Sequence, residues 1–189
     1  MDTAITIAII GACVSITGWL VNHIFSTSAA KRQERLNFQL EFTKQQLEEL
    51  YGPLVFLVLE GHRTFKDLLE AFGRNYIFKK DETLSEDELK TWLFWTENDF
   101  FPRNEKIKQL ISSKTYLIEG EKVPESWLMF LDHYNSWKIN HDRWSKEGIE
   151  YSWHSRVNWP DDFEKDVIST FEMLKKRHSE LVGRKGRKD

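Results

Sequence analysis

An uncharged, apolar stretch near the N-terminus dominates this sequence. From Thr3 to Ala30 no residue carries a formal charge, and the part from Ala4 to Phe25 consists mainly of Ile, Val, Ala and Leu. A helix of about 20 such residues crosses the hydrocarbon core of a bilayer, which is about 30 Å thick. The sequence therefore predicts one N-terminal transmembrane helix, with residues 1–30 as a membrane anchor.

A cleaved signal peptide is the strongest alternative, because Ser28, Ala29 and Ala30 offer the small residues that a signal peptidase prefers. Two features argue against cleavage. No Lys or Arg precedes the apolar run, and the run is longer than the roughly 7 to 15 residues of a signal-peptide core. We therefore expect a retained signal-anchor and a single-pass membrane protein.

The distribution of charge predicts the orientation of this anchor. Only Asp2 precedes the span, whereas Lys31, Arg32 and Arg35 follow it at once. Flanks that are rich in Lys and Arg stay on the cytoplasmic side of a membrane. We expect a protein of the cell inner membrane, with its N-terminus outside and its larger C-terminal part in the cytosol. The same three basic residues either bind anionic lipid at the membrane surface or serve only to orient the span.

Small and polar residues form one stripe along the predicted span. They recur at alternating spacings of four and three residues, which places them on one helix face; they are Ala4, Ala8, Gly11, Ser15, Gly18 and Asn22. Small residues let helix backbones approach closely in lipid, and Asn or Ser can form hydrogen bonds across the contact. The stripe predicts membrane self-association and hence a homo-oligomer, although such residues are also common in membrane helices that do not associate.

A helical stalk is expected over residues 31–52, because this segment is rich in Gln, Glu, Leu and Lys, which favour helix. A heptad-like rhythm runs through Leu36, Leu40, Thr43, Leu47 and Leu50. The rhythm fits a short coiled coil, and it fits equally well a helix that packs on its own domain.

The stalk leads into the motif L-Y-G-P-L at residues 50–54. Together with the N-terminal span and the basic, Gln- and Leu-rich stalk, this motif resembles that of a group of small bacterial single-span membrane-anchored proteins. The resemblance covers about the first third of the chain. It implies a prokaryotic or phage-related origin and transfers no activity.

The remaining sequence, residues 53–183, predicts a cytosolic bundle of about five or six helices, so the expected fold class is all-α. Gly73 is placed to end the first of these helices, and Ser85 with a glutamate three residues later forms a capping box for the next. Pro102 predicts the end of that helix.

Two further boundaries complete the expected bundle. Gly148 should end a long helix that begins after Pro124, and the last helix should stop at Gly183. Residues 184–189 then form a basic tail.

The charge balance bears on possible partners, and the cysteine content bears on disulfide bonds. Lys and Arg total 27 against 30 Asp and Glu, a near balance that gives no reason to expect nucleic acid as a partner. The single cysteine, Cys13, lies inside the apolar stretch, so no intramolecular disulfide is possible.

One helix carries the richest candidate site, a pocket face made of His133, Trp137, His141 and Trp144. His133 and His141 are two turns apart, about 12 Å along a helix axis, which is too far for both to bind one metal ion. We therefore interpret the face as packed aromatic and histidine side chains.

Catalytic motifs are weak throughout the sequence. The dipeptide His141-Asp142 invites comparison with all-helical metal-dependent phosphohydrolases of the HD type, for which His62 and either Asp162 or Asp166 would complete the metal ligands. No nucleotide-binding, zinc-protease or serine-hydrolase motif is present. We predict no catalytic residues, no metal and no cofactor.

Three functional hypotheses follow from the sequence. The first is a non-enzymatic scaffold that binds a protein partner at the cytosolic membrane face. The second is an oligomerising membrane effector of a phage-defence or toxin-type system. The third is a cryptic helical metal-dependent hydrolase that draws on His62, His133, His141 and His154.

Overall fold

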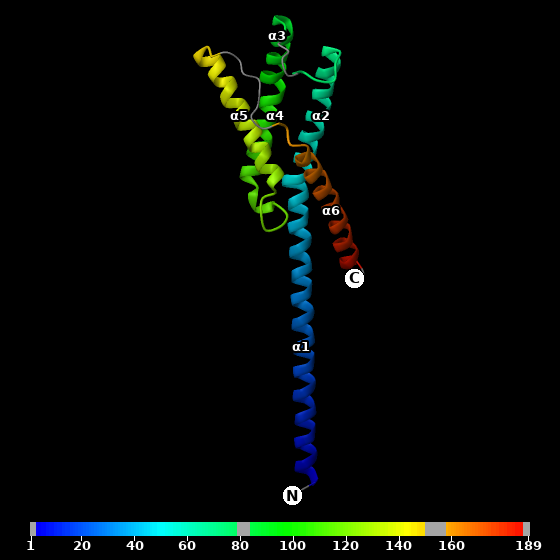
Figure 1. Cartoon of the computed structure of the whole chain (residues 1–189). Helices are drawn as coiled ribbons and strands as arrows, with labels where there is room; N and C mark the ends of the chain where they lie inside the picture. The colour runs from blue at the N-terminus through cyan, green and yellow to red at the C-terminus, as the bar shows by residue number, and fades with distance from the viewer. Residues whose placement is uncertain (1–2, 79–83, 150–157, 187–189) are drawn as a thin grey trace. The chain divides into compact units, whose positions relative to one another are not determined.

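The computed structural model describes residues 3–78, 84–149 and 158–186, without the side chains of residues 4–10, 12–14 and 21. Every regular element in these ranges is a helix, and no strand occurs in them, so the all-α prediction is confirmed (Figure 1). The elements in chain order are α1 (Thr3–Gln45), η1 (Gln46–Tyr51), α2 (Gly52–Phe72), α3 (Glu86–Trp95), η2 (Thr96–Phe100), α4 (Phe101–Ser113), η3 (Thr115–Leu117), α5 (Glu125–Glu147) and α6 (Asp161–Gly186).

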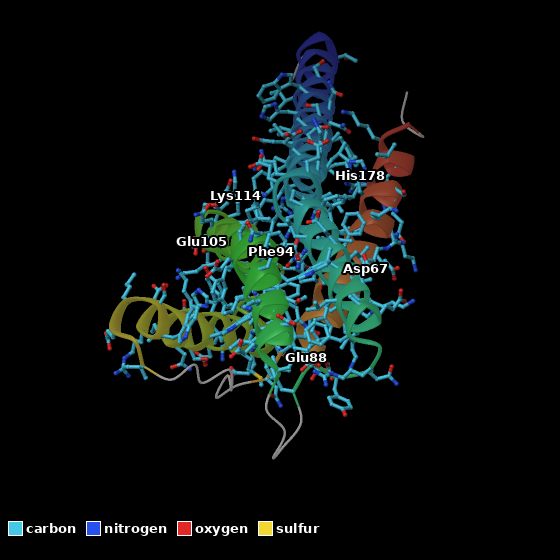
Figure 2. All side chains as sticks on the ribbon, turned by 90° about the horizontal axis from the view of Figure 1, so that it is seen from above. Asp67, Glu88, Phe94, Glu105, Lys114 and His178 are labelled. Carbon is cyan, nitrogen blue, oxygen red and sulfur yellow. The ribbon has the colours of Figure 1, made fainter. Side chains whose placement is uncertain are left out.

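The chain forms two compact units. Unit 1 consists of Met1–Phe42 and His178–Asp189, and unit 2 consists of Thr43–Arg177. Helix α6 passes from unit 2 into unit 1 at His178, which is labelled in Figure 2. Its helical conformation continues to Gly186, so the predicted stop at Gly183 is wrong. A glycine with negative φ can remain in a helix, and Gly183 is not among the described glycines with positive φ.

Helix α1 is a single helix of 43 residues, which corresponds to a length of about 65 Å. Among the described residues, no helix combines the length and the apolar character needed to cross a membrane. The predicted transmembrane helix is therefore not supported by the described part of α1. Half of the apolar stretch from Ala4 to Phe25, at residues 4–10, 12–14 and 21, lies outside the described side chains.

Two π-helical segments accommodate the prolines that follow them. In η1 the amide of Gly52 donates to the carbonyl of Leu47, and in η2 the amide of Phe101 donates to the carbonyl of Thr96. Each bond spans five residues, so the backbone widens just before a proline that has no amide hydrogen to donate. The prediction that Pro102 ends a helix is therefore wrong, because α4 continues directly from η2.

Gly52 is required by this wide turn. A Cβ at position 52 would lie 2.6 Å from the carbonyl oxygen of Leu47, which is backbone and cannot move aside. The Gly-Pro pair within the L-Y-G-P-L motif therefore has a local structural reason, since glycine permits the π turn and proline begins α2.

Local capping signals are confirmed at three helix ends. Gly73 and Gly148 have φ values of 65° and 66° and end α2 and α5 in the left-handed conformation. Ser85 caps α3, its hydroxyl accepting from the amide of Glu88 while the Glu88 carboxylate accepts from the amide of Ser85.

The core of unit 2 is built around aromatic residues. Helix α4 contacts both α2 and α5. Phe163 of α6 stacks on Phe130 of α5 with ring centroids 4.7 Å apart, and Trp127 and Phe163 form a T-shaped pair with centroids 6.0 Å apart. All three side chains are fully buried. Such pairs stabilise the fold beyond the area that they bury.

A polar node ties the loop after η3 to two helices. The Glu119 carboxylate accepts hydrogen bonds from Arg177 at 3.1 and 2.7 Å and from Gln46 at 3.0 Å. The Glu119 amide donates to the hydroxyl of Tyr51, which is otherwise buried. These bonds hold the loop after η3 against η1 and α6.

Three of the five heptad-like positions of the stalk are buried within the single chain, and Leu40 and Leu47 are partly exposed. Leu36, Thr43 and Leu50 are 8 %, 3 % and 0 % exposed. This burial favours the alternative in which the stalk helix packs on its own domain over a coiled coil with another chain.

Candidate functional site

The best candidate site is a cavity of about 1180 Å³ in unit 2. Its wall includes residues from α2, α3, η2, α4, α5 and α6 and from the segment after α2. The volume is slightly above the about 300–1,000 Å³ that is usual for ligand pockets. The cavity is therefore large enough to receive a bulky group.

Aromatic rings make up much of the cavity wall; they are Phe65, Tyr76, Phe78, Trp92, Phe100, Trp137 and Trp159. Trp92 stacks on Trp137 with ring centroids 5.5 Å apart, and Phe78 and Trp92 form a T-shaped pair with centroids 4.9 Å apart. Phe100 lies within 6.2 Å of both Phe65 and Trp137. These mutual contacts hold the rings in place, so the wall is formed without a ligand.

Arg103 supplies a buried charge to this wall. Its side chain lies one turn after Asp99, and the two form a bidentate ion pair with Nη1–Oδ1 and Nη2–Oδ2 distances of 3.0 and 2.6 Å. The guanidinium also lies 5.6 Å from the ring centre of Phe100. Asp99 compensates the charge, which is the usual condition for an arginine that is only 5 % exposed.

Gly61 of α2 makes room for this arginine. A Cβ at position 61 would lie 3.0 Å from Nε of Arg103. The close approach of α2 to Arg103 thus depends on the absence of a side chain at this position.

Two histidines also line the cavity. His62 Nδ1 lies 3.5 Å from a carboxylate oxygen of Glu164, and its side chain is 65 % exposed. The ring of His133 lies 5.8 Å from Trp137 and 5.7 Å from Trp159. Both histidines are therefore placed at the cavity wall, although the described residues hold no group of three or more His, Cys, Asp or Glu side chains that could bind one metal ion.

The structure divides the pocket face that the sequence predicts on α5. His133 and Trp137 line the cavity, whereas His141 and Trp144 do not. His141 Nε2 lies 3.2 Å from a Glu97 carboxylate oxygen, and its ring contacts the ring of Phe101 at 4.9 Å. Burial lowers the pKa of His141 below its usual value, despite the opposing effect of Glu97. This histidine is thus part of the packed interior.

The candidate ligands of an HD-type metal site have other partners. Asp142 pairs with Lys138 and Lys146 at 3.4 Å each. Asp166 accepts a hydrogen bond of 2.5 Å from Ser126. Another candidate of the hydrolase hypothesis, His154, lies outside the described residues.

Sequence reasoning missed Arg103, Asp99 and Gly61. A local signal was available for the pair, because an acid four residues before a base on a helix predicts an ion pair. No local signal marks Gly61, since its role depends on α2 meeting α4.

The predicted membrane residues lie on α1. Gly11, Ser15, Gly18 and Asn22 are exposed, while the side chains of Ala4 and Ala8 lie outside those described. A Cβ at Gly11 or Gly18 would meet no atom within 4 Å. The basic residues Lys31, Arg32 and Arg35 are exposed as well.

Comparison with known proteins gives no relative from which an activity could be carried over. No protein-family model, no curated protein and no solved structure matches the chain.

Proposed function

We propose that this chain is a non-enzymatic, membrane-anchored binding protein, and that its helical unit 2 holds a partner protein at the cytosolic face of the membrane. The observation that carries this proposal is the aromatic cavity. Its buried Arg103 is paired with Asp99, and His62 lies beside Glu164. What the wall offers a partner is therefore mainly the faces and edges of aromatic rings.

The chemistry of the cavity favours a peptide segment with a bulky apolar side chain. Aromatic pockets of this kind receive the anchor residues that dominate binding energy at protein interfaces. The α6 side of the wall carries Asp161, Glu164 and Glu172 against a single cation, Lys165. A basic residue beside the apolar anchor would complement these acids. The near-neutral chain gives no comparable reason to propose nucleic acid.

The membrane anchor in this proposal is residues 3–30. Its support is the uncharged sequence together with the large apolar side chains that α1 leaves exposed, namely Ile16, Trp19, Leu20, Ile24 and Phe25. Such side chains on one helix are unfavourable in water and favourable in lipid. The basic residues after Ala30 orient unit 2 toward the cytosol.

Site-specific photo-crosslinking in cells tests the binding proposal. A photoreactive phenylalanine at Tyr76, which lines the cavity, should yield a discrete cross-linked product. The same group at Phe94, which is 65 % exposed and does not line the cavity, should not. Ser169→Trp should reduce the Tyr76 product by occupying part of the cavity, whereas Ser179→Trp on the same helix should leave it unchanged. Equal products from both positions, or an undiminished product in Ser169→Trp, would refute the proposal.

A second candidate is the oligomerising membrane effector. The open space around Gly11 and Gly18 favours it, because a partner helix could approach there. Gly11→Ile combined with Gly18→Ile should reduce self-association in a membrane two-hybrid assay, and an unchanged signal would remove this candidate. Induced expression should also disturb growth or membrane potential if the assembly acts on the bilayer.

A further inference from the structure

The end of α6 returns to the stalk that follows the proposed anchor. Residues His178–Gly186 belong to the same compact unit as α1 up to Phe42, although more than a hundred residues separate them along the chain. Figure 1 shows the last turns of α6 running in the opposite direction to α1. Each of the two segments buries one leucine, since Leu36 is 8 % and Leu181 is 5 % exposed.

The basic residues of these two segments of unit 1 are here called the basic collar, which consists of Lys31, Arg32, Arg35, Arg184 and Lys185. All five side chains are exposed, and none of them forms an ion pair with another residue in the described ranges. The described acids of the same segments are Glu34, Glu41 and Glu180, so the collar is net positive.

The collar lies where α1 would leave the bilayer. Lys31 directly follows Ala30, the last residue of the uncharged run, and Arg35 lies about 6 Å beyond Lys31 along the helix axis. The last turns of α6 run in the opposite direction to α1, and Arg184 and Lys185 belong to the same compact unit as Lys31. Charges within about 10 Å of a membrane surface still interact with its lipids at physiological salt.

Arg184 and Lys185 are not needed to orient the span. The rule that positive residues stay inside operates on the residues that flank a membrane helix in the sequence, and these two lie at the far end of the chain. Both residues nevertheless belong to the same compact unit as the stalk, and a negatively charged surface is the complementary partner of such exposed cations.

We propose that the basic collar binds the headgroups of anionic phospholipids in the leaflet that faces unit 2. Arg184 and Lys185 at the end of α6 thereby bind lipid headgroups at the membrane surface together with the basic residues of the stalk. This inference rests on the proposed anchor, because a chain without one would not present the collar to a bilayer.

Lipid retention by the full chain tests the collar. The protein is purified in mild detergent, mixed with equal amounts of phosphatidylglycerol and phosphatidylcholine, and examined by native mass spectrometry. We expect about tenfold stronger retention of phosphatidylglycerol, which raised salt should weaken. Arg184→Gln with Lys185→Gln should lose most of this preference. The control, Lys175→Gln with Lys176→Gln, removes two charges from α6 within unit 2 and should keep it.

Three results would overturn the proposal. The first is an equal retention of phosphatidylglycerol and phosphatidylcholine by the wild-type chain. The second is an equal loss of the phosphatidylglycerol preference in both double variants. The third is that a short RNA displaces bound phosphatidylglycerol at a lower concentration than added phosphatidylglycerol does. A membrane wash separates this failure from failure of the anchor. If the wild-type chain stays in washed membranes but shows no lipid preference, only the collar is wrong. If it leaves the membrane without detergent, the anchor and the collar both fail.

Discussion

The close approach of Gly61 to Arg103 allows a quantitative test of the cavity wall. A Cβ at position 61 would lie 3.0 Å from Nε, 3.5 Å from Cζ and 3.7 Å from Cδ of Arg103. Asp99 holds both ends of the guanidinium, at 3.0 and 2.6 Å. Arg103 therefore cannot move without weakening that ion pair, and the methyl group of Gly61→Ala must push against a fixed side chain.

Two effects of opposite sign decide the stability of Gly61→Ala. Alanine in a helix interior is favoured over glycine by about 1 kcal/mol, whereas overpacking a close-packed site costs about 1–3 kcal/mol. We expect Gly61→Ala to lower the free energy of unfolding by about 1 kcal/mol. In an Arg103→Met background the flexible Met side chain can yield, so the same substitution should raise that free energy by up to about 1 kcal/mol.

Thermal unfolding of the full chain in mild detergent, followed by circular dichroism, measures the effect of Gly61→Ala on stability in each background. A change of 1 kcal/mol shifts the midpoint by about 2–4 °C in a domain of this size. Gly183→Ala serves as a control, because a Cβ there meets no atom within 4 Å. Equal stabilisation by Gly61→Ala with and without Arg103 would refute the close contact between α2 and Arg103.

The further predictions concern three residues of the fold, Glu119, His141 and Ser85. Glu119→Gln should lower the free energy of unfolding in denaturant by about 1–2 kcal/mol, because a neutral amide replaces the carboxylate that accepts two charge-assisted hydrogen bonds from Arg177. The control Glu121→Gln, at an exposed site, should change that free energy by less than about 0.5 kcal/mol. The hydrogen bond from Arg177 lowers the pKa of Glu119, so stability should fall as the pH drops below about 4.5, and Glu119→Gln should flatten that fall. Burial lowers the pKa of His141, so the unfolded chain takes up this proton first and stability should also decline below about pH 6.5; His141→Phe should remove this decline, and an unchanged profile would contradict the assignment. Ser85→Ala should cost about 1 kcal/mol through loss of the α3 cap, and no loss would mean that the capping box does not form in solution.

Local chemistry in the sequence predicts the helix boundaries where one residue type has one conformational use. Gly73 and Gly148 end helices because glycine adopts the left-handed conformation at little cost, and Ser85 begins one because its hydroxyl caps a free amide. The prediction that Pro102 ends a helix is wrong for a physical reason. A missing amide stops an ideal α-helix, but one π turn before the proline lets the helix continue.

The cavity could be predicted only in part, because it depends on which helices meet. Helical spacing correctly placed His133 and Trp137 near each other, yet His141 on the same helix faces Glu97 and Phe101 instead. The spacing defines a face of α5 but not the elements that cover each part of it. The pairing of Gly61 with Arg103 is likewise invisible until α2 and α4 are packed together.

Membrane extraction of the intact protein tests the central proposal most directly. Membranes from cells that express the full chain are washed at alkaline pH, which removes peripheral proteins, and are then treated with mild detergent. The proposal predicts that the chain stays in the washed membranes, that detergent releases it, and that its N-terminal sequence precedes the apolar run. Recovery of the full chain in the alkaline wash, or an N-terminus at Lys31, would contradict a binding protein held at the membrane by residues 3–30.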